Sequence, residues 1–483
     1  MAGIMLAILL AAMDQTIVST AMPEIVRELH GLEHISWVFT AYMLASTITT
    51  PIFGKLSDIF GRRGLYLLAI VVFLAGSILS GAAHSMLALI LFRGLQGIGG
   101  GAIMVTSMAL IADIFPPAER GKWQGVIGGA FGVASVAGPL LGGWITDDFS
   151  WRWVFYVNIP LGILAMIVLW WALPKIPAHK GVKIDWLGAG LLATTLMPLL
   201  LGVVWGGSTY AWTSATEVVL FAVAALSLFF FLWREGSTPN PILSLGLFKN
   251  RVFAASVATV FLTAMGMFGA IVYIPLFAQT VLHSSATRSG LVLTPMMLAL
   301  VFGSAVSGQV VSRTGKYRWV AIAGVALIVV GVFLFTTIGP NTTNLSLSLR
   351  MIVLGLGLGP TMPIFTLAVQ SAFEQRQTGE VTAAVQMFRS IGGTVGTALL
   401  GGVMNSRLAA ALAAGSSQTD AFIKAVDHVF LVGTGFMAAA FVAVWFLPQI
   451  ALRRSHAPVG VVEEAGRELE DVWGQDDPSP AYH

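Results

Sequence analysis

Long apolar runs repeat along almost the whole of this chain, and each approaches or exceeds the length that crosses a bilayer as a helix. Only 10% of the 483 residues are charged, whereas 56% are hydrophobic. So few charges cannot cover a water-soluble domain of this size. The 53 glycines are typical of closely packed transmembrane helices. The sequence therefore predicts an all-α membrane protein.

We expect fourteen transmembrane helices, arranged as two pseudo-symmetric six-helix bundles with two further helices inserted between them. The N-terminal bundle takes residues 1–174, the inserted pair and its linkers 175–240, and the C-terminal bundle 241–450. The polar, acidic remainder, 451–483, is typical of a disordered cytoplasmic tail. The expected spans are 3–23, 35–54, 64–82, 87–112, 125–146, 152–172, 185–205, 215–233, 252–280, 287–310, 319–338, 346–371, 381–405 and 429–449.

Lysine and arginine predict the orientation of these spans. If the N-terminus is cytoplasmic, eighteen of the 26 basic residues fall in inner loops and the tail, and six fall in outer loops. Basic residues favour the cytoplasmic side of a membrane, so we expect both termini in the cytoplasm. An even number of spans gives the same answer. The expected location is the bacterial cytoplasmic (inner) membrane.

A charged turn between two apolar runs, residues 54–63, returns in similar form at residues 308–317. Each copy has two glycines seven residues apart, with basic residues after the second. The pair Gly142-Gly143 of span five likewise returns at Gly401-Gly402 of span thirteen. The two offsets, 254 and 259 residues, are close enough to indicate one duplication. Matched halves with a binding site at their interface are typical of secondary transporters.

Five motifs within residues 14–160 resemble those of a known family, the major facilitator superfamily. Its loop 2–3 signature is similar to Gly54-x-x-x-Asp58-x-x-Gly61-Arg62-Arg63. Its fourth-helix signature resembles Arg93-x-x-Gln96-Gly97. Its fifth-helix signature of antiporters resembles Gly138-Pro139-Leu140-Leu141-Gly142-Gly143. Its fourteen-span drug/proton antiporters, the EmrB/QacA-like group, have motifs similar to Asp14-Gln15-Thr16-Ile17-Val18 and to Trp151-Arg152-Trp153-Val154-Phe155-Tyr156-Val157-Asn158-Ile159-Pro160.

The resemblance covers all fourteen spans and implies a function. It implies a multidrug efflux antiporter that exports lipophilic compounds by alternating access in exchange for protons. The second charged turn departs from the family pattern, because Ser312 stands where the first turn has Asp58. Any gate at the second turn should therefore be weaker or differently arranged.

Asp14 is the only one of the 23 acidic residues near the middle of an expected span. A carboxylate is costly in the membrane, so it faces the bundle interior or a water-filled cavity. Desolvation favours the neutral form of such an acid, which suits a group that takes up and releases protons. Arg93 of span four can pair with ionised Asp14. The alternatives are that Asp14 only orders its helix through Thr16 and Ser19, and that Arg93 only bonds backbone carbonyls.

The substrate cavity is expected between the two halves. Little negative charge faces it beyond Asp14, which favours lipophilic neutral or singly charged cationic substrates. For each aromatic residue the alternative is a place in the core, and for Arg389 it is a brace for span thirteen. The candidate cavity residues are Tyr42, Gln96, Phe268, Gln279, Gln386 and Arg389.

The first charged turn is expected to form a gate at the cytoplasmic end. Asp58 can contact the positive N-terminal end of a facing helix, which the resemblance places near Glu380 and Val381, and Arg62 can reach Asp113. The alternative is that the basic residues serve only topology. The gating residues are Gly54, Asp58, Gly61, Arg62, Arg63 and Asp113. The fifth-helix motif, Gly138, Pro139, Gly142 and Gly143, supports close helix packing and bending.

Several classes of function have no support in the sequence. The chain has no cysteine, and its eight histidines lie in loops, span ends or the tail, so we expect no metal site. No Gly-x-x-x-x-Gly-Lys-Ser/Thr motif is present, so a proton gradient rather than a cofactor is the expected energy source. We expect no enzyme and no nucleic-acid partner, but a monomer that meets small lipophilic molecules, protons and membrane lipids. Two alternatives remain, a proton/solute symporter and a lipid-handling exporter of the same fold.

Overall fold

The computed structural model describes residues 1–30, 34–173, 184–206, 209–282, 292–340 and 342–452. These residues form helices joined by short loops, with no β-strand among them. The expected tail, 451–483, lies outside the described residues from 453 onward. The all-helical class predicted from the sequence is thus confirmed for the described chain.

The helices fall into three groups along the chain. The first group is α1 (Ala2–Leu29), α2 (Ile35–Phe60), α3 (Arg62–Gly81), α4 (Met86–Ile114), α5 (Pro117–Asp148), α6 (Trp153–Tyr156) and α7 (Asn158–Ala172). The second is the pair α8 (Trp186–Trp205) and α9 (Ala215–Ser237). The third is η2 (Leu245–Lys249), α10 (Arg251–Thr280), α12 (Thr294–Thr314), α13 (Tyr317–Leu334), η3 (Phe335–Thr337), α14 (Asn344–Ala372), η4 (Gln375–Gln377), α15 (Thr378–Ala413) and α16 (Gln418–Trp445).

Thirteen helical stretches of the described chain are long and apolar enough to cross a membrane. The helix α2, with 26 residues, is a further long helix that is not among them. Hydroxyl residues line this helix, and two of them bond to its own backbone: Thr47 Oγ1 donates to the Met43 carbonyl and Thr50 Oγ1 to the Ser46 carbonyl. The described chain therefore has thirteen to fourteen candidate membrane helices.

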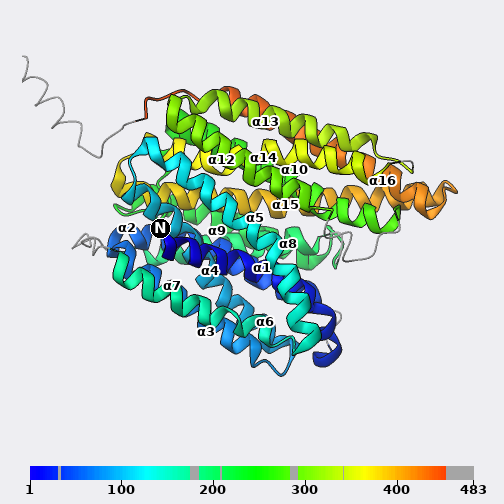
Figure 1. Ribbon diagram of the computed structural model, residues 1–483, viewed down its shortest axis with the longest axis horizontal. Coiled ribbons are helices and arrows are strands. Elements are labelled where there is room, and N and C mark those ends of the chain that lie inside the picture. The colour runs from blue at the N-terminus through cyan, green and yellow to red at the C-terminus, as the bar shows by residue number, and fades with distance from the viewer. Residues whose placement is uncertain (31–33, 174–183, 207–208, 283–291, 341, 453–483) are drawn as a thin grey trace, which may run out of the picture.

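The last helix differs from its predicted span. The sequence placed this span at 429–449, but α16 begins at Gln418. Ser417 caps the helix by accepting the backbone N–H of Asp420 at 3.1 Å, and an acid in the first turn suits the positive end of the helix dipole. Polar capping residues thus extend the helix beyond its apolar stretch, and α15 and α16 project together from one end of the bundle (Figure 1).

Each of the outer groups packs mainly against itself. In the first group α1 packs on α5 and α7, while α4 packs on α2 and α3. In the third group α14 packs on α12 and α13, and α10 packs on α15 and α16. The two groups meet where α2 lies along α15 and α5 lies along α12. Figure 1 shows α1, α3, α6 and α7 on one side of this seam and α12, α13, α14 and α16 on the other.

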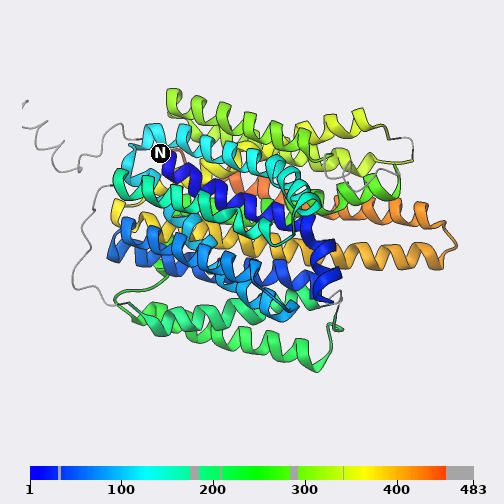
Figure 2. The same ribbon diagram turned by 60° about the horizontal axis from the view of Figure 1, so that its bottom comes forward.

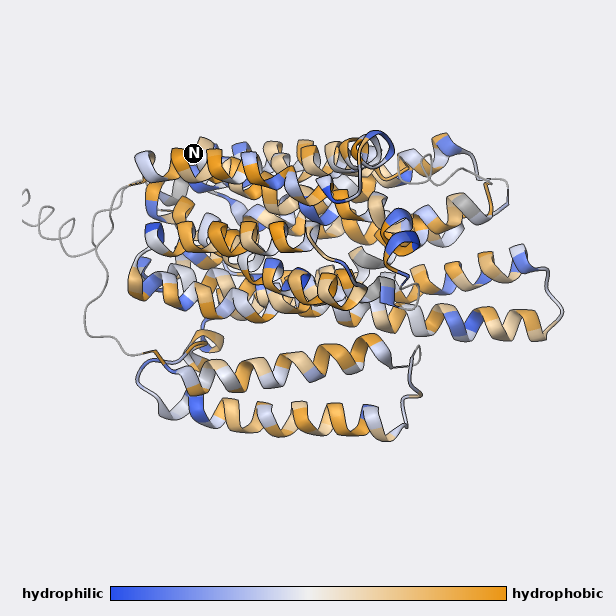
Figure 3. Ribbon diagram, turned by 90° about the horizontal axis from the view of Figure 1, so that it is seen from below, coloured by the Kyte–Doolittle hydropathy of each residue, from blue (hydrophilic) through white to orange (hydrophobic). Residues whose placement is uncertain are grey.

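The pair α8 and α9 lies beside the seam between the two groups. The two helices pack on each other, and α8 also contacts α2 and α15. Figures 2 and 3 show the pair set apart at one edge of the bundle. Large apolar side chains of α9 are exposed there, with Phe229 65% and Trp233 64% accessible. Such a surface suits contact with lipid tails.

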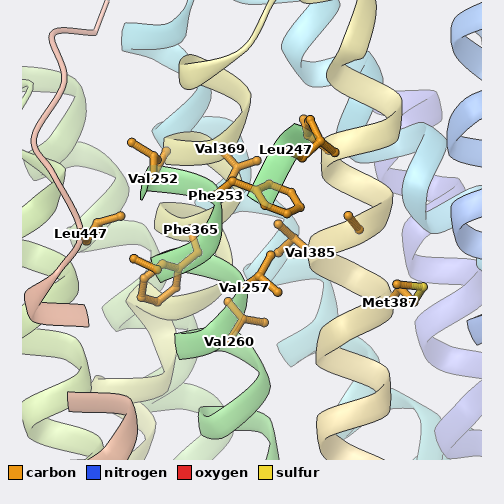
Figure 4. Close-up of a cluster of buried hydrophobic side chains, with 14 of the residues drawn as sticks. Leu247, Val252, Phe253, Val257, Val260, Phe365, Val369, Val385, Met387 and Leu447 are labelled. Atoms are coloured by element: carbon orange, nitrogen blue, oxygen red, sulfur yellow. The ribbon is translucent and has the colours of Figure 1, made fainter. Parts of the chain in front are cut away.

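The core of the third group is built from β-branched and aromatic side chains. Phe253 of α10, Phe365 of α14 and Val385 of α15 are completely buried in one cluster, which Figure 4 shows in close-up. Separate apolar clusters fill the first group, around Phe73 of α3 and around Trp151. Both halves therefore have their own close-packed apolar interior, in which a buried polar side chain is an exception.

Candidate functional site

Asp14 lies near the middle of α1 and is completely buried. Its Oδ2 accepts a hydrogen bond from Arg93 Nη1 at 2.5 Å, and its Oδ1 accepts one from Gln96 Nε2 at 2.7 Å. Arg93 Nη1 also donates to Gln96 Oε1 at 2.7 Å. Arg93 and Gln96 are neighbours on α4 because they are three residues apart. The structure thus brings together Asp14 and Arg93, the residues that the sequence proposed for proton coupling. Gln96, which the sequence proposed for the substrate cavity, contacts both of them.

Asn158 is a further partner of Asp14 that the sequence analysis did not single out. It is the first residue of α7, and its Nδ2 donates to Asp14 Oδ1 and to Ser77 Oγ, each at 3.0 Å. Ser77 in turn donates to the Phe155 carbonyl at 2.9 Å. A lone asparagine within an apolar span is the signal that could have identified it. We call Asp14, Arg93, Gln96 and Asn158 the buried polar cluster.

Tyr42 of α2 covers the buried polar cluster. The guanidinium carbon of Arg93 lies 4.4 Å from the centre of the Tyr42 ring, within the range of a cation–π contact. Arg93 Nε also donates to the Val38 carbonyl of α2 at 3.4 Å. This closeness of α2 and α4 needs glycine, because a Cβ added at Gly97 would collide with the Tyr42 carbonyl. Tyr42 therefore belongs to the wall of the cluster.

The buried polar cluster is internally neutral, with one carboxylate and one guanidinium. Removing the charge of one partner from such a pair leaves the other uncompensated in a low-dielectric interior. A proton on Asp14 would therefore weaken its bond to Arg93 and change the packing of α1 against α4.

The fifth-helix motif lies next to this cluster. Gly138 and Gly142 of α5 face α1, since a Cβ added to either would collide with the side chain of Thr16 or Thr20. Thr16 Oγ1 donates to the Ala134 carbonyl at 3.1 Å and so ties the two helices together. The other two residues of the motif face elsewhere: Pro139 is exposed, and a Cβ at Gly143 would meet nothing within 4 Å.

The first charged turn joins the two halves at the end of the bundle where α2 ends. Asp58 accepts backbone N–H groups from the first turn of α15, at 3.0 Å from Gly379 and 2.9 Å from Glu380. Arg62 Nη2 pairs with Asp58 at 2.6 Å, and its Nε donates to Asp113 of α4 at 2.7 Å.

Glycine shapes this turn in two ways. Gly54 allows close contact, because its added Cβ would meet Ala383 and the Gly379 carbonyl. Gly61 separates α2 from α3 with a φ of 87°, a value that favours glycine.

Three further contacts across the seam were not predicted from the sequence. Lys55 Nζ pairs with Glu380 Oε2 at 2.8 Å. Gln370 of α14 donates to the Met108 carbonyl of α4 at 3.2 Å, and Arg120 of α5 donates to the Gln370 carbonyl at 3.5 Å. We call the contacts of Asp58, Lys55 and Gln370 across the seam the inner gate, after the gating role and cytoplasmic position expected from the sequence.

Two other charged-turn residues lie outside these contacts. Arg63 stacks over the Trp170 ring of α7 at 4.8 Å and donates to the Trp170 carbonyl at 2.7 Å. In the second turn, Gly308 of α12 packs against Gly121 of α5, where an added Cβ would meet the Gly121 carbonyl. The seam between α5 and α12 is therefore held by backbone contact rather than by ion pairs.

A cavity of about 410 Å³ lies at the seam on the side away from the inner gate. Its walls come from the parts of four helices that lie away from the inner gate: α2 with Met43, α8 with Val203, α10 with Tyr273, and α15 with Thr397. Tyr42, Gln96, Gln386 and Arg389 are not among its lining residues. The contribution of α8 shows that an inserted helix closes one side of this space, which the sequence analysis did not anticipate.

The candidate cavity residues of the third group are only partly described. Gln386 and Arg389 are neighbours on α15, where Arg389 Nη1 donates to Gln386 Oε1 at 2.7 Å. Phe268 and Gln279 belong to α10, and their side chains lie outside the described part of the chain. Among the described residues, no group of three or more His, Asp or Glu side chains could hold a metal ion.

Comparison with known proteins shows the family of this chain. The family model described as Major Facilitator Superfamily matches residues 4–397. The multidrug transporter protein MdtP of Bacillus subtilis is 41% identical over 436 residues, which cover 90% of this chain and 79% of that protein. Multidrug resistance protein 3 of the same organism is 39% identical over 404 residues, which cover 84% of this chain and 79% of that protein.

A solved structure shares the fold. The crystal structure of the human organic anion transporter MFSD10 aligns with a TM-score of 0.64 at 17% sequence identity, covering 90% of this chain and 98% of that one. At this identity the likeness concerns the fold alone. With its many apolar helices and these relatives, the chain is a multi-pass membrane protein.

Proposed function

Because this chain belongs to the Major Facilitator Superfamily, we propose that it is a proton-coupled multidrug exporter of the fourteen-span EmrB/QacA-like group. The relatives named as multidrug transporters support export of drugs. The observation that carries the proton coupling is the buried polar cluster, in which Asp14 is the completely buried acid of α1. We place both termini in the cytoplasm of a bacterial cell, with the chain a monomer in the inner membrane and no cofactor required.

Protonation of Asp14 is the step that drives the exporter. The carboxylate accepts bonds from α4 and α7, at 2.5 Å from Arg93 and 3.0 Å from Asn158. A neutral carboxyl loses its charge attraction to Arg93, so α1 is released from α4. Because Gly138 and Gly142 hold α5 tightly on α1, α5 moves with it. Movement of α5 reaches the other half through the Gly121–Gly308 contact with α12.

We propose that the two ends of the seam open in turn, which would give alternating access. At one end the inner gate is closed by the contacts of Asp58 and Lys55 with α15. At the other end the seam holds the cavity of about 410 Å³. Proton release to the cytoplasm and substrate loading from the cytoplasm require the inner gate to open and this cavity to close. The described conformation is therefore the one that faces outward.

Transport into proteoliposomes under an imposed pH gradient tests this proposal. The probes are two xanthene dyes, rhodamine 123 and rhodamine 110, and dye and proton movement are both recorded. We expect the wild type to exchange dye for protons in opposite directions, and Asp14→Asn to bind dye without coupled exchange. Asp148→Asn, which changes an exposed acid at the end of α5, is the matched control and should behave as the wild type. Movement of dye and protons in the same direction would instead indicate a symporter.

A lipid-handling exporter is the second candidate, and one observation favours it. The cavity of about 410 Å³ is bordered by α8, and the exposed side chains of α9 are large and apolar. A lipid could reach the seam beside this pair. Transfer of a fluorescent phospholipid between proteoliposome leaflets by the wild type, without any proton exchange for dye, would favour this candidate over drug export.

A further inference from the structure

Arg389 is a cation deep in α15 whose bonding is incomplete. Its Nη1 donates to Gln386, but its Nη2 is buried and has no hydrogen-bond partner among the described residues. A buried donor of a charged group without a partner is destabilising, so such an atom calls for an explanation. Within the described chain, none of the ion pairs includes Arg389, whereas Arg93 and Arg62 each face a carboxylate.

The side chain of Arg389 lines a small cavity inside the C-terminal half. The space measures about 30 Å³ and is bordered by α10, α12 and α14, with Thr263 and Thr361 as its other polar residues. This volume has room for about two water molecules. No acidic residue lines it. Thr263 Oγ1 and Thr361 Oγ1 each donate to a carbonyl of their own helix, Thr259 at 2.8 Å and Leu358 at 2.7 Å. The site therefore presents one positive charge, surrounded by apolar side chains and two internally bonded hydroxyls.

The small cavity lies about one helical turn closer to the inner gate than the cavity of about 410 Å³, here called the large cavity, and shares two of its helices. On α15, Gly393 lines the large cavity and follows Arg389 by four residues, a rise of ~6 Å. On α10, Met267 lines the small cavity and Val272 the large one. An amphipathic molecule with an apolar body and an acidic end suits this spacing of about one helical turn, with the body in the large cavity and the acid pointing toward Arg389.

Charge balance supports an acidic rather than a cationic end. The carboxylate of Asp14 is already occupied by Arg93, Gln96 and Asn158, so it offers no free charge to a cation. Arg389 is the uncompensated charge in the middle of the described spans. We propose that Arg389, positioned by Gln386, binds the carboxylate of lipophilic acids and zwitterions, and that these are preferred substrates. This inference rests on the proposed export function, and it replaces the neutral or cationic substrates expected from the sequence with acids and zwitterions.

Binding of a matched dye pair tests the proposal. Rhodamine 110 carries a free benzoate, and rhodamine 123 is its methyl ester, so the two differ at the group that Arg389 would bind. Fluorescence polarisation on the purified protein measures both affinities. We expect the wild type to prefer rhodamine 110. Arg389→Gln should weaken rhodamine 110 at least tenfold more than rhodamine 123, because hydrogen bonds to charged groups are the stronger class.

Two further variants keep the result interpretable. Arg389→Lys keeps the charge and should retain part of the preference, which a general loss of folding would not allow. Arg350→Gln removes another arginine with an unpartnered Nη1, near the start of α14, and should leave both affinities unchanged. Equal affinity of the wild type for the two dyes, binding of neither dye, or an equal loss of both in Arg389→Gln would overturn the proposal.

The dye-binding and proton-exchange experiments together show whether the Arg389 site or the proposed function fails. A clear preference for rhodamine 110 in a protein whose Asp14→Asn variant still exchanges protons would leave the Arg389 site standing and reject the coupling role of Asp14. Coupled exchange that depends on Asp14, without any preference between the dyes, would reject the Arg389 site alone.

Discussion

Replacing Asp58 by asparagine should open the inner gate. In the structure both carboxylate oxygens of Asp58 are used, by the N–H groups of Gly379 and Glu380, and Arg62 pairs with the same group. Asparagine keeps one acceptor oxygen, so the change removes about one charge-assisted hydrogen bond across the seam. Such a bond contributes about 1.5–3 kcal/mol. The population with the inner gate open should therefore rise by ~10- to 150-fold.

A single cysteine can report this opening because the chain has none of its own. Thr366 is a suitable position: it is buried, it lies one turn from Gln370 on the same face of α14, and its hydroxyl bonds only to its own helix at Met362. The rate at which a maleimide labels Thr366→Cys measures how often the inner gate opens.

Labelling should be ~10- to 150-fold faster when Asp58→Asn is combined with Thr366→Cys. The matched control is Glu119→Gln, which changes an exposed acid in the first turn of α5, at the end of α5 that contains Arg120. Its labelling rate should equal that of Thr366→Cys alone. An unchanged rate with Asp58→Asn would refute the reasoning, because it would show that these contacts do not hold the seam closed.

Three other changes have defined outcomes. Gly97→Ala should lower the thermal unfolding temperature of the purified protein, since its Cβ collides with the Tyr42 carbonyl and overpacking costs about 1–3 kcal/mol; an unchanged temperature would show that α2 and α4 can separate freely. Lys55→Gln should also speed labelling of Thr366→Cys, but less than Asp58→Asn does, because the lysine is partly exposed and contributes a single ion pair; a larger effect would reverse this ranking. Asn158→Leu should slow coupled exchange of dye for protons, because Asp14 loses the hydrogen bond that ties it to α7; an unchanged rate of exchange would place Asn158 outside the coupling step.

Much of the fold could be predicted from the sequence, because a membrane leaves few alternatives to apolar helices of fixed length. The superfamily could be recognised from short motifs. The all-helical class of the described chain and its membership of the superfamily are both confirmed. The contact of Asp14 with Arg93 could also be anticipated, since two opposite charges deep in apolar spans have few other partners. Asp58 could be directed to the start of α15 for a similar reason, because a helix N-terminus attracts an acid.

Other contacts depend on helix register and could not be predicted. Asn158 reaches Asp14 only because α6 ends at Tyr156 and α7 begins one residue after Val157, a break that no apolar pattern marks. Lys55 meets Glu380 because α2 and α15 run side by side, and their register is set by Gly54. The sequence grouped Arg63 with the gate, whereas the structure places it against α7, since neighbouring side chains of a helix such as Arg62 and Arg63 point about 100° apart.

Substrate-driven proton release by the purified protein tests the central claim most directly. The protein is placed in a weakly buffered solution with a pH indicator, and rhodamine 110 is added to the wild type, to Asp14→Asn and to Asp148→Asn. We predict that the wild type and Asp148→Asn release protons when the dye binds, and that Asp14→Asn binds the dye without releasing them. Equal release by Asp14→Asn, or dye binding to the wild type without any release, would contradict the account.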